Sequence, residues 1–372
     1  MKIREDIIKH YEDWWEGKNT EPVFYYGYRE EAFDPAPYKK SWMYHKLDTG
    51  WAVAQALELI HQGEDFRILD EALEMVRAWH QGERFLGDGF PNYFFNLGPG
   101  CLAANITGFS KFGDNTNWFE LTRPMPYEAI TSLPEDVRTE YAVLTGRAMK
   151  AAAEKLADTV AISQADLGGT VDILASLRST HQLLYDTMDE DPETIKQSLA
   201  KIDSIWKRYY DEYDALYAPK NGGLRSSWMP ILSKKRYYPL QCDFGAMISP
   251  ATFREFTVPA LERLCAFLDR AIFHLDGPEM IPHLPLLADI KGINAIQWTA
   301  GDGEAPLEDE CWFDLYKKII DSGKKIVLLG YPASEEAVRR LFARFPKREF
   351  YLMIWGSDRE TGERLLRMSG NI

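Results

Sequence analysis

The chain has few cysteines and no excess of positive charge, and each shortage excludes a class of protein. Its 372 residues include four cysteines (Cys101, Cys242, Cys265 and Cys311), which form neither a CxxC pair nor a disulfide framework. Aspartate and glutamate number 57 against 43 lysines and arginines, which gives a net charge of −14. Because phosphate backbones and anionic membrane surfaces are bound by basic faces, neither is an expected partner.

Long apolar runs are also missing. No run approaches the roughly 20 residues of a transmembrane helix, and the acidic, helix-patterned start lacks the apolar segment of a signal peptide. The sequence therefore predicts a cytoplasmic protein with reduced thiols. It contains no P-loop, GxSxG, HExxH, EF-hand or kinase motif, which disfavours a serine-nucleophile enzyme.

A regular alternation of apolar and helix-patterned segments fills the C-terminal half. Short segments that are apolar throughout predict parallel strands, and the segments between them, with apolar residues three or four apart, predict helices that cover those strands. The apolar segments are 272–277, 293–303, 324–332 and 348–358, and the helix-patterned segments are 279–290, 311–323, 334–345 and 359–368.

Further units of the same kind precede this half. Residues 159–178 predict a strand, a loop and a helix, and residues 238–270 predict another unit in which Ser249-Pro250 starts the helix. Residues 191–217 predict a long helix. About eight units fit the length, which favours a (β/α)8 TIM-type barrel. A doubly wound sheet is the alternative, but no strand is followed by a glycine-rich phosphate fingerprint.

The absence of repeats and long linkers predicts one domain over residues 1–372, with residues 1–85 as a mostly helical extension packed on the barrel. In such a barrel, polar side chains at the carboxyl ends of the strands face the active-site mouth. These candidates are Gln164, Asp166, Cys242, Asp243, His274, Asp276, Gln297, Trp298, Tyr331, Trp355 and Asp358.

His274 and Asp276 stand out among these candidates because residues two apart on a strand point to the same side. Imidazole and carboxylate both bind zinc, and Cys242 could supply a thiolate, so these three residues form a candidate catalytic metal site with an open position. The alternative uses the same groups without metal: His274 exchanges a proton and Asp276 binds the substrate. A histidine after an apolar run is also often a hydrogen-bonded core residue.

Two other stretches offer ligand-binding groups. The loop around Gly98-Pro99-Gly100 is flanked by amide and indole side chains, a chemistry that suits hydroxyl-rich or amide-bearing ligands, although asparagines in turns are an equally good explanation. Those side chains are Asn92, Asn96, Asn115, Asn117 and Trp118. Tyr25 and Arg29, near the end of an early apolar run, are candidates for the pocket rim, with aromatic core packing as the alternative for the tyrosine.

Residues 241–298 contain Ser249-Pro250, a Phe-x-Glu-Phe stretch at 253–256 and Pro259, followed by "IFHLDG" and "GINAIQW". In these features the segment resembles the uroporphyrinogen decarboxylase superfamily, which also contains zinc-dependent methyltransferases that act on methylated corrinoid proteins. Residues 162–179 are similar to a ligand-facing segment of the family. The resemblance implies a (β/α)8 barrel with a deep cleft at its carboxyl-terminal mouth, and members that are monomers or homodimers.

The chain departs from the best-known members of this family. The decarboxylase binds its substrate's carboxylates with an arginine-rich N-terminal motif. The corresponding stretch of this chain has only Arg29, which is followed by Glu30 and Glu31. The methyltransferases bind zinc through a His-x-Cys element and a second cysteine near the C-terminus. Asp276 replaces the first cysteine, and the C-terminal region has none.

Together these features favour a methyltransferase-type enzyme that handles a small organic substrate, or a corrinoid or folate methyl carrier. His274, Asp276 and Cys242 would form its centre, with zinc and a corrinoid partner protein as the implied cofactors. The residues expected to bind the substrate are Gln164, Asp166, Asp243, Gln297, Trp298, Tyr25, Arg29, Tyr331 and Trp355. A metal-free decarboxylase or lyase and a non-catalytic ligand-binding barrel are the alternatives.

Overall fold

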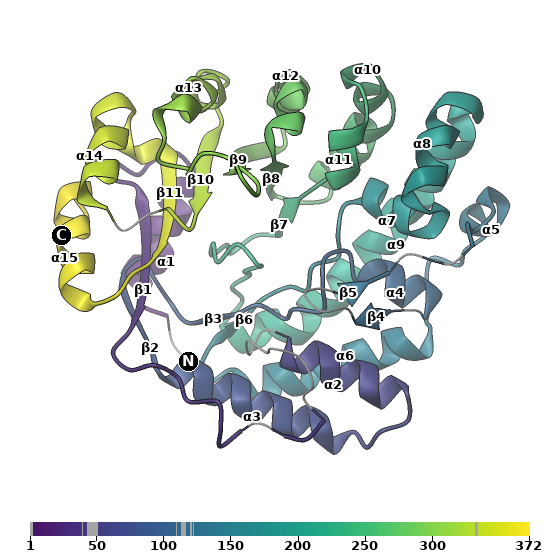
Figure 1. Cartoon of the computed structure of the whole chain (residues 1–372), viewed down its shortest axis with the longest axis horizontal. Coiled ribbons are helices and arrows are strands. Elements are labelled where there is room, and N and C mark those ends of the chain that lie inside the picture. Colours follow the sequence, from purple (N-terminus) through teal and green to yellow (C-terminus); the bar gives the residue numbers. More distant parts are fainter. Residues whose placement is uncertain are drawn as a thin grey trace.

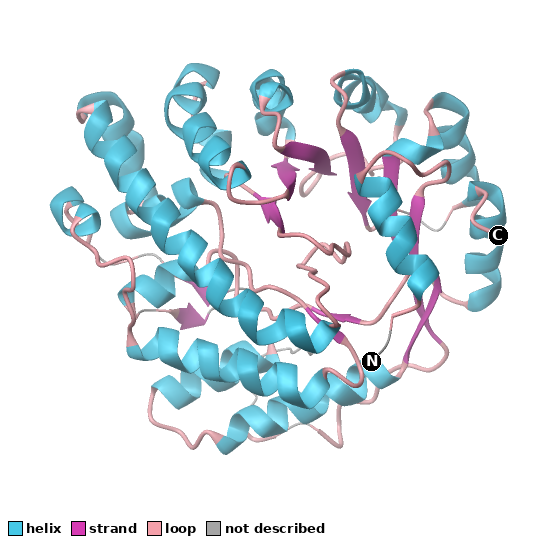
Figure 2. Cartoon of the chain, turned by 180° about the vertical axis from the view of Figure 1, so that it is seen from behind, coloured by secondary structure: helices cyan, strands magenta, loops and turns pink. Residues whose placement is uncertain are grey.

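The computed structural model describes residues 3–38, 40–42, 51–108, 110–112, 117–119, 121, 123–331 and 334–372. Figure 1 shows helices arranged around the periphery and most strands inside them, and the view from behind in Figure 2 has the same arrangement. Among the described residues, none of the helices combines the length and the hydrophobicity that crossing a bilayer requires.

A mostly parallel sheet of seven strands organises the fold, in the order β2-β1-β11-β10-β9-β8-β7. Within this sheet, as far as the chain is described, β1 and β2 are antiparallel and the other neighbouring strands are parallel. A separate parallel pair joins β3 to β6, and β4 pairs with β5 in antiparallel fashion. The strands are β1 (Val23–Arg29), β2 (Glu83–Gly87), β3 (Asn92–Tyr93), β4 (Lys111–Phe112), β5 (Asn117–Trp118), β6 (Ala161–Ile162), β7 (Tyr237–Leu240), β8 (Arg270–Asp276), β9 (Ile293–Thr299), β10 (Lys325–Leu329) and β11 (Phe350–Trp355).

Helices connect the parallel strands. The α-helices are α1 (Glu5–Trp15), α2 (Ala52–His61), α3 (Arg67–Gln81), α4 (Leu102–Thr107), α5 (Tyr127–Thr131), α6 (Glu140–Leu156), α7 (Thr170–Arg178), α8 (Thr180–Asp189), α9 (Pro192–Tyr217), α10 (Pro250–Thr252), α11 (Val258–Cys265), α12 (Leu284–Asp289), α13 (Phe313–Asp321), α14 (Glu335–Arg344) and α15 (Arg359–Ser369). Short 3₁₀ helices occur between them, including η2 (Asp243–Met247) after β7.

The four predicted strand–helix alternations are confirmed: β8, β9, β10 and β11 are followed by α12, α13, α14 and α15. Ser249 caps α10 by accepting a hydrogen bond from the backbone N–H of Thr252, as its place before Pro250 predicts. Residues 1–85, expected to be a mostly helical extension, contain α1, α2 and α3. They also supply β1, which lies inside the main sheet between β11 and β2.

Helix α1 covers the amino-terminal ends of several strands. Its Trp15 ring lies 5.2 Å from that of Tyr237 on β7, and its Trp14 ring lies 6.4 Å from that of Tyr351 on β11. These rings belong to one buried cluster with side chains from β1 and β6 to β11, namely Val23, Tyr25, Ala161, Tyr237, Ile272, Ala295, Val327 and Tyr351. The side chains of α1 therefore form an aromatic plug at the amino-terminal ends of these strands.

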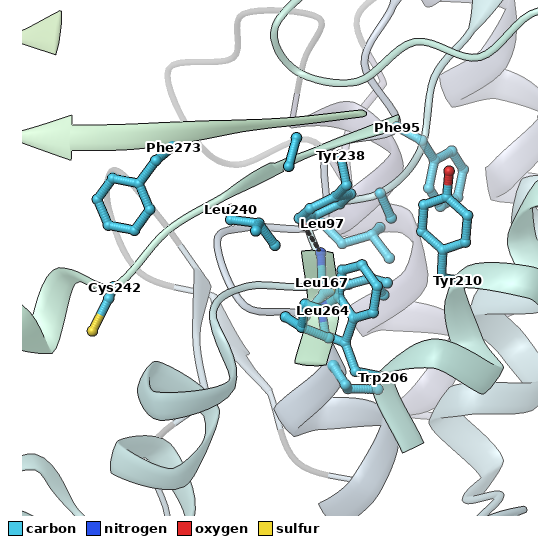
Figure 3. Close-up of a cluster of buried hydrophobic side chains, with 14 of the residues drawn as sticks. Phe95, Leu97, Leu167, Trp206, Tyr210, Tyr238, Leu240, Cys242, Leu264 and Phe273 are labelled. Carbon is cyan, nitrogen blue, oxygen red and sulfur yellow. Dashed lines mark hydrogen bonds between the residues drawn. The ribbon is translucent and has the colours of Figure 1, made fainter. Parts of the chain in front are cut away.

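Hydrogen bonds of side chains, rather than strand pairing, connect the segment after β6 to β7. The Tyr238 hydroxyl accepts a hydrogen bond from the backbone N–H of Leu167 at 2.7 Å and donates one to Asp166 Oδ1 at 3.1 Å. The Tyr210 hydroxyl of α9 accepts from the backbone N–H of Tyr237 and donates to its carbonyl. Figure 3 shows Tyr238 and Tyr210 in the buried cluster between these segments. The carboxyl ends of β6 and β7 are thereby held on the same side of the molecule.

Candidate functional site

A cavity of about 260 Å³ lies where the carboxyl ends of β3, β6, β7 and β8 meet. Parallel strands bring these ends to one edge, so residues far apart in sequence share the cavity wall. The lining residues are Trp51, Phe94, Asn96, Pro99, Asp166, Trp228, Gln241, Asp243 and His274.

Three potential metal ligands lie together, and two of them, Asp243 and His274, line this cavity. Asp243, His274 and Asp276 each offer one ligand atom, and these atoms all lie within 4.8 Å of one another. Strand β8 places His274 and Asp276 on one side, with His274 Nε2 3.8 Å from Asp276 Oδ2. The first residue of η2 supplies Asp243. The set of one imidazole and two carboxylates suits zinc and harder divalent ions.

Gln297 on the neighbouring strand β9 determines how the His274 ring is protonated. The Gln297 Nε2 donates to the carbonyl of Trp298 at 2.9 Å and to Thr299 Oγ1 at 2.7 Å, which identifies its other amide atom, Oε1, as an acceptor. Since Nδ1 of His274 contacts Oε1, this ring nitrogen carries the proton. In the neutral ring, Nε2 therefore keeps its lone pair, and this is the nitrogen that faces Asp276.

Two further carboxyl groups near this group have raised pKa values. Burial raises the pKa of Asp166 to about 6, although hydrogen bonds from Gly168 and Tyr238 oppose the shift. Asp172 of α7 accepts a hydrogen bond from the backbone N–H of Phe244 at 2.9 Å. Burial and the charge of Asp243 raise the pKa of Asp172 to about 8.

Asp243 reaches solvent, but the protein packed around its carboxyl group still raises its pKa. The nearby charge of Asp276 acts in the same direction, while His274 opposes it. Crowded carboxylates of this kind resist ionisation unless a cation neutralises them. The candidate site thus has the electrostatic character of a cation-binding site.

Cys242, predicted to be the third ligand, is not in this group. Its side chain is buried, with Sγ 3.8 Å from Thr257 Oγ1, and burial raises the pKa of the thiol well above its usual range. In Figure 3 Cys242 lies at the edge of the hydrophobic cluster. The structure brings its neighbour Asp243 to His274 and Asp276 instead.

Several predicted substrate-binding residues lie away from the cavity lining. The Gln164 amide is buried and bonds to the carbonyl of Tyr210 and to the backbone N–H of Ala165. Tyr25 is buried in the interior cluster and donates to the carbonyl of Phe90 at 2.7 Å.

Arg29 is also engaged elsewhere. Its guanidinium group lies 3.9 Å from the ring centre of Trp79 and donates to the Trp79 carbonyl at 2.8 Å. It also contacts Glu83 at 3.4 Å. These interactions support the chain around β2, away from the cavity.

The remaining predicted residues also have structural contacts. Trp298 is buried with its ring 5.0 Å from that of Trp312, and the Tyr331 hydroxyl donates to the carbonyl of Ala337 at 3.2 Å. Trp355 at the end of β11 is 46% exposed and packs near Phe85. Asp358 caps α15.

The asparagine-rich stretch contributes one residue to the cavity wall. Asn96 lines the cavity and accepts a hydrogen bond from the backbone N–H of Gly98, whereas Asn92 donates to the carbonyl of Ser227. Asn117 and Trp118 form β5. Asn115 lies outside the described residues.

The sequence analysis missed the aromatic part of the wall, Trp51, Phe94 and Trp228. Trp228 is the clearest case, since its ring centre lies 5.1 Å from that of His274 in a T-shaped arrangement. It belongs to an irregular segment between α9 and β7, where no periodic pattern marks its direction. No protein family model matches the chain, and no curated protein matches it.

Proposed function

We propose that the protein is a metal-dependent enzyme of the uroporphyrinogen decarboxylase-like type that transfers a methyl group between a small organic substrate and a corrinoid or folate carrier. The observation that carries this proposal is the His274 ring, which presents Nε2 to Asp276 while Nδ1 is bound by Gln297. That arrangement is typical of metal-binding histidines, whose second nitrogen donates to a neighbouring acceptor.

We propose a closed (β/α)8 barrel as the framework. The main sheet and the β3–β6 pair together contain eight strands in parallel sets, β1, β3, β6, β7, β8, β9, β10 and β11. Side-chain hydrogen bonds support closure between the two sheets. The Tyr25 hydroxyl of β1 donates to the carbonyl of Phe90, two residues before β3, and the Tyr238 hydroxyl of β7 joins Leu167 and Asp166 after β6. The interior cluster with residues from seven of these strands also supports closure.

In this proposal, Asp243, His274 and Asp276 hold a divalent ion such as zinc. The ion supplies Lewis acidity toward an oxygen or nitrogen group of the substrate. Gln297 keeps the His274 ring oriented, and Asp172 holds the backbone of the turn that carries Asp243. Because oxygen ligands replace thiolates, the site suits an oxygen or nitrogen group better than a thiol.

The test is a methyl-transfer assay under anoxic conditions. Zinc-loaded protein is mixed with cob(I)alamin and a panel of methylated oxygen and nitrogen compounds, and formation of methylcob(III)alamin is followed by absorbance. We expect at least one compound to react with the wild-type protein and to react at least tenfold more slowly with His274→Ala. Equal rates for the wild type, the variant and chelator-treated protein would contradict the proposal.

A metal-free decarboxylase or lyase is the second candidate, and Asp166 favours it. Its carboxyl group lines the cavity, and a pKa of about 6 suits a group that gives up a proton near neutral pH. For a lyase, chelator treatment should leave product release unchanged, while Asp166→Asn should reduce the rate about 100-fold. Loss of activity on chelation with no effect of Asp166→Asn would exclude this candidate.

A further inference from the structure

Aromatic and acidic side chains share the cavity wall, and basic ones are missing from it. Trp51, Phe94 and Trp228 line it together with the carboxyl groups of Asp166 and Asp243. Across the described part of the chain, no lysine or arginine lines this cavity. Aromatic rings attract cations through their negative faces, and carboxylates attract them by charge. Both kinds of group therefore favour a ligand with a positive charge.

Asp166 has a carboxylate oxygen available to such a ligand. The side chain is 7% exposed, and its Oδ1 accepts hydrogen bonds from the backbone N–H of Gly168 at 2.9 Å and from the hydroxyl of Tyr238 at 3.1 Å. Oδ2 receives no hydrogen bond from any of the residues that the structure describes. A buried carboxylate held through one oxygen, on the wall of a cavity, is a fixed anionic anchor.

One carboxylate at the cavity would remain without a compensating positive charge even with a divalent ion bound nearby. A divalent ion between Asp243 and Asp276 balances the formal charges of those two carboxylates. Asp166 then remains without a cationic partner, since neither a lysine nor an arginine of the described chain lines the cavity. A bound monocation beside Asp166 would balance the third carboxylate and reduce the cost of its burial.

We propose that the cavity binds the ammonium group of a small organic cation, such as a methylated or quaternary amine, between Asp166 and the aromatic side chains of Trp228, Phe94 and Trp51. This inference rests on the proposed function and names its substrate class. The volume of about 260 Å³ limits the ligand to a small molecule, because pockets for drug-sized ligands are roughly 300–1,000 Å³.

The positive charge is the property that the test must isolate. Choline and 3,3-dimethylbutan-1-ol have nearly the same shape, but only choline is charged, so their affinities separate charge recognition from apolar packing. Isothermal titration calorimetry with zinc-loaded and with chelator-treated protein should show saturable choline binding. We expect the neutral alcohol to bind at least tenfold more weakly.

Three variants locate the binding site. Asp166→Asn should weaken choline binding about tenfold while zinc still binds with the same stoichiometry, because the amide keeps the shape and removes the charge. Trp228→Leu should weaken choline binding about threefold to thirtyfold. Asp302→Asn, which removes an exposed carboxylate outside the cavity lining, should leave choline affinity unchanged.

Equal binding of the alcohol and choline, or no choline binding at tens of millimolar with either protein sample, would overturn this inference. So would a choline affinity that Asp166→Asn and Trp228→Leu both leave unchanged. The two proposals fail separately. If zinc binds and choline does not, the substrate class is wrong and the metal centre stands. If choline binds and zinc does not, the metal centre is wrong and the cation site stands.

Discussion

His274 Nε2 lies 3.8 Å from Asp276 Oδ2, and the opposite ring nitrogen contacts the amide oxygen of Gln297. The ring is thus positioned by β9 and directed toward a carboxylate on its own strand. An imidazole held in this way is prepared to bind a metal ion or to exchange a proton through Nε2.

Gln297 should therefore control metal affinity without touching the ion. We expect Gln297→Leu to weaken zinc binding about 10-fold to 100-fold, because Nδ1 of His274 loses its acceptor. Gln297→Glu should retain affinity within a few-fold, since its carboxylate still accepts from Nδ1. Zinc titration with a chromophoric competitor measures both, with Gln62→Leu on the protein surface as the control. Wild-type affinity in Gln297→Leu would contradict the assigned role.

Cys242 and Asp243 give opposite predictions for adjacent residues. Cys242→Ser should bind zinc with unchanged affinity, because the buried thiol faces Thr257 and its raised pKa disfavours the thiolate. Asp243→Ala should weaken zinc binding at least tenfold, because it removes one of the three proposed ligands. Competitive titration of both variants checks this pair. The reverse result would restore the cysteine as the ligand.

Asp166 should make stability depend on pH. Its folded pKa of about 6 lies above the usual value of 3.8, so the folded protein keeps a proton that the unfolded chain releases. The contribution of this group to wild-type stability should thus fall as pH rises from about 4 to about 6 and then stay constant. Asp166→Asn lacks this loss, so its stability relative to wild type should increase over the same window, by up to about 3 kcal/mol.

Urea unfolding of metal-free protein at several pH values measures this difference. The largest causes of the raised pKa of Asp172 are its burial and the charge of Asp243, which both proteins keep, so most of its contribution should cancel. Gln62→Leu, which removes no titratable group from the surface, is the control, and its difference from wild type should not change over that window. If the stability of Asp166→Asn relative to wild type instead decreased as pH rises, the Asp166 carboxylate would not be destabilised by burial.

The plug formed by α1 should contribute strongly to stability. Glu12 accepts two hydrogen bonds from Arg270 on β8, at 2.6 and 2.8 Å, and the Arg270 side chain is only 4% exposed. We expect Glu12→Ala to reduce the free energy of unfolding by about 3 kcal/mol, because it leaves a buried guanidinium group without its carboxylate. Glu16→Ala, which removes an exposed partner of Lys18, should have a much smaller effect on urea unfolding, because solvent screens an exposed ion pair. Equal effects of the two variants would contradict the plug.

The sequence predicted the repeating architecture because the signal there is local. Apolar runs followed by amphipathic segments identified β8 to β11 and α12 to α15, and the strand period placed His274 and Asp276 on one side. These inferences need only the order of residues within one element.

The rest of the site depends on backbone paths that no pattern encodes. Strand β7 ends at Leu240, and Cys242, with φ −158° and ψ 83°, leads directly into a 3₁₀ turn. The strand period therefore no longer applies at Cys242 and Asp243. Tyr25 is the third residue of β1, too near the beginning of that strand to reach its carboxyl end, and it packs in the interior cluster instead.

Zinc stoichiometry tests the central claim most directly. Protein purified without chelator and then dialysed against zinc should hold one ion per chain by elemental analysis, and His274→Ala and Asp276→Ala should each hold none after the same treatment. Circular dichroism confirms that the variants are folded. A folded wild-type protein that holds no zinc after this treatment, or variants that hold as much as the wild type, would contradict the account.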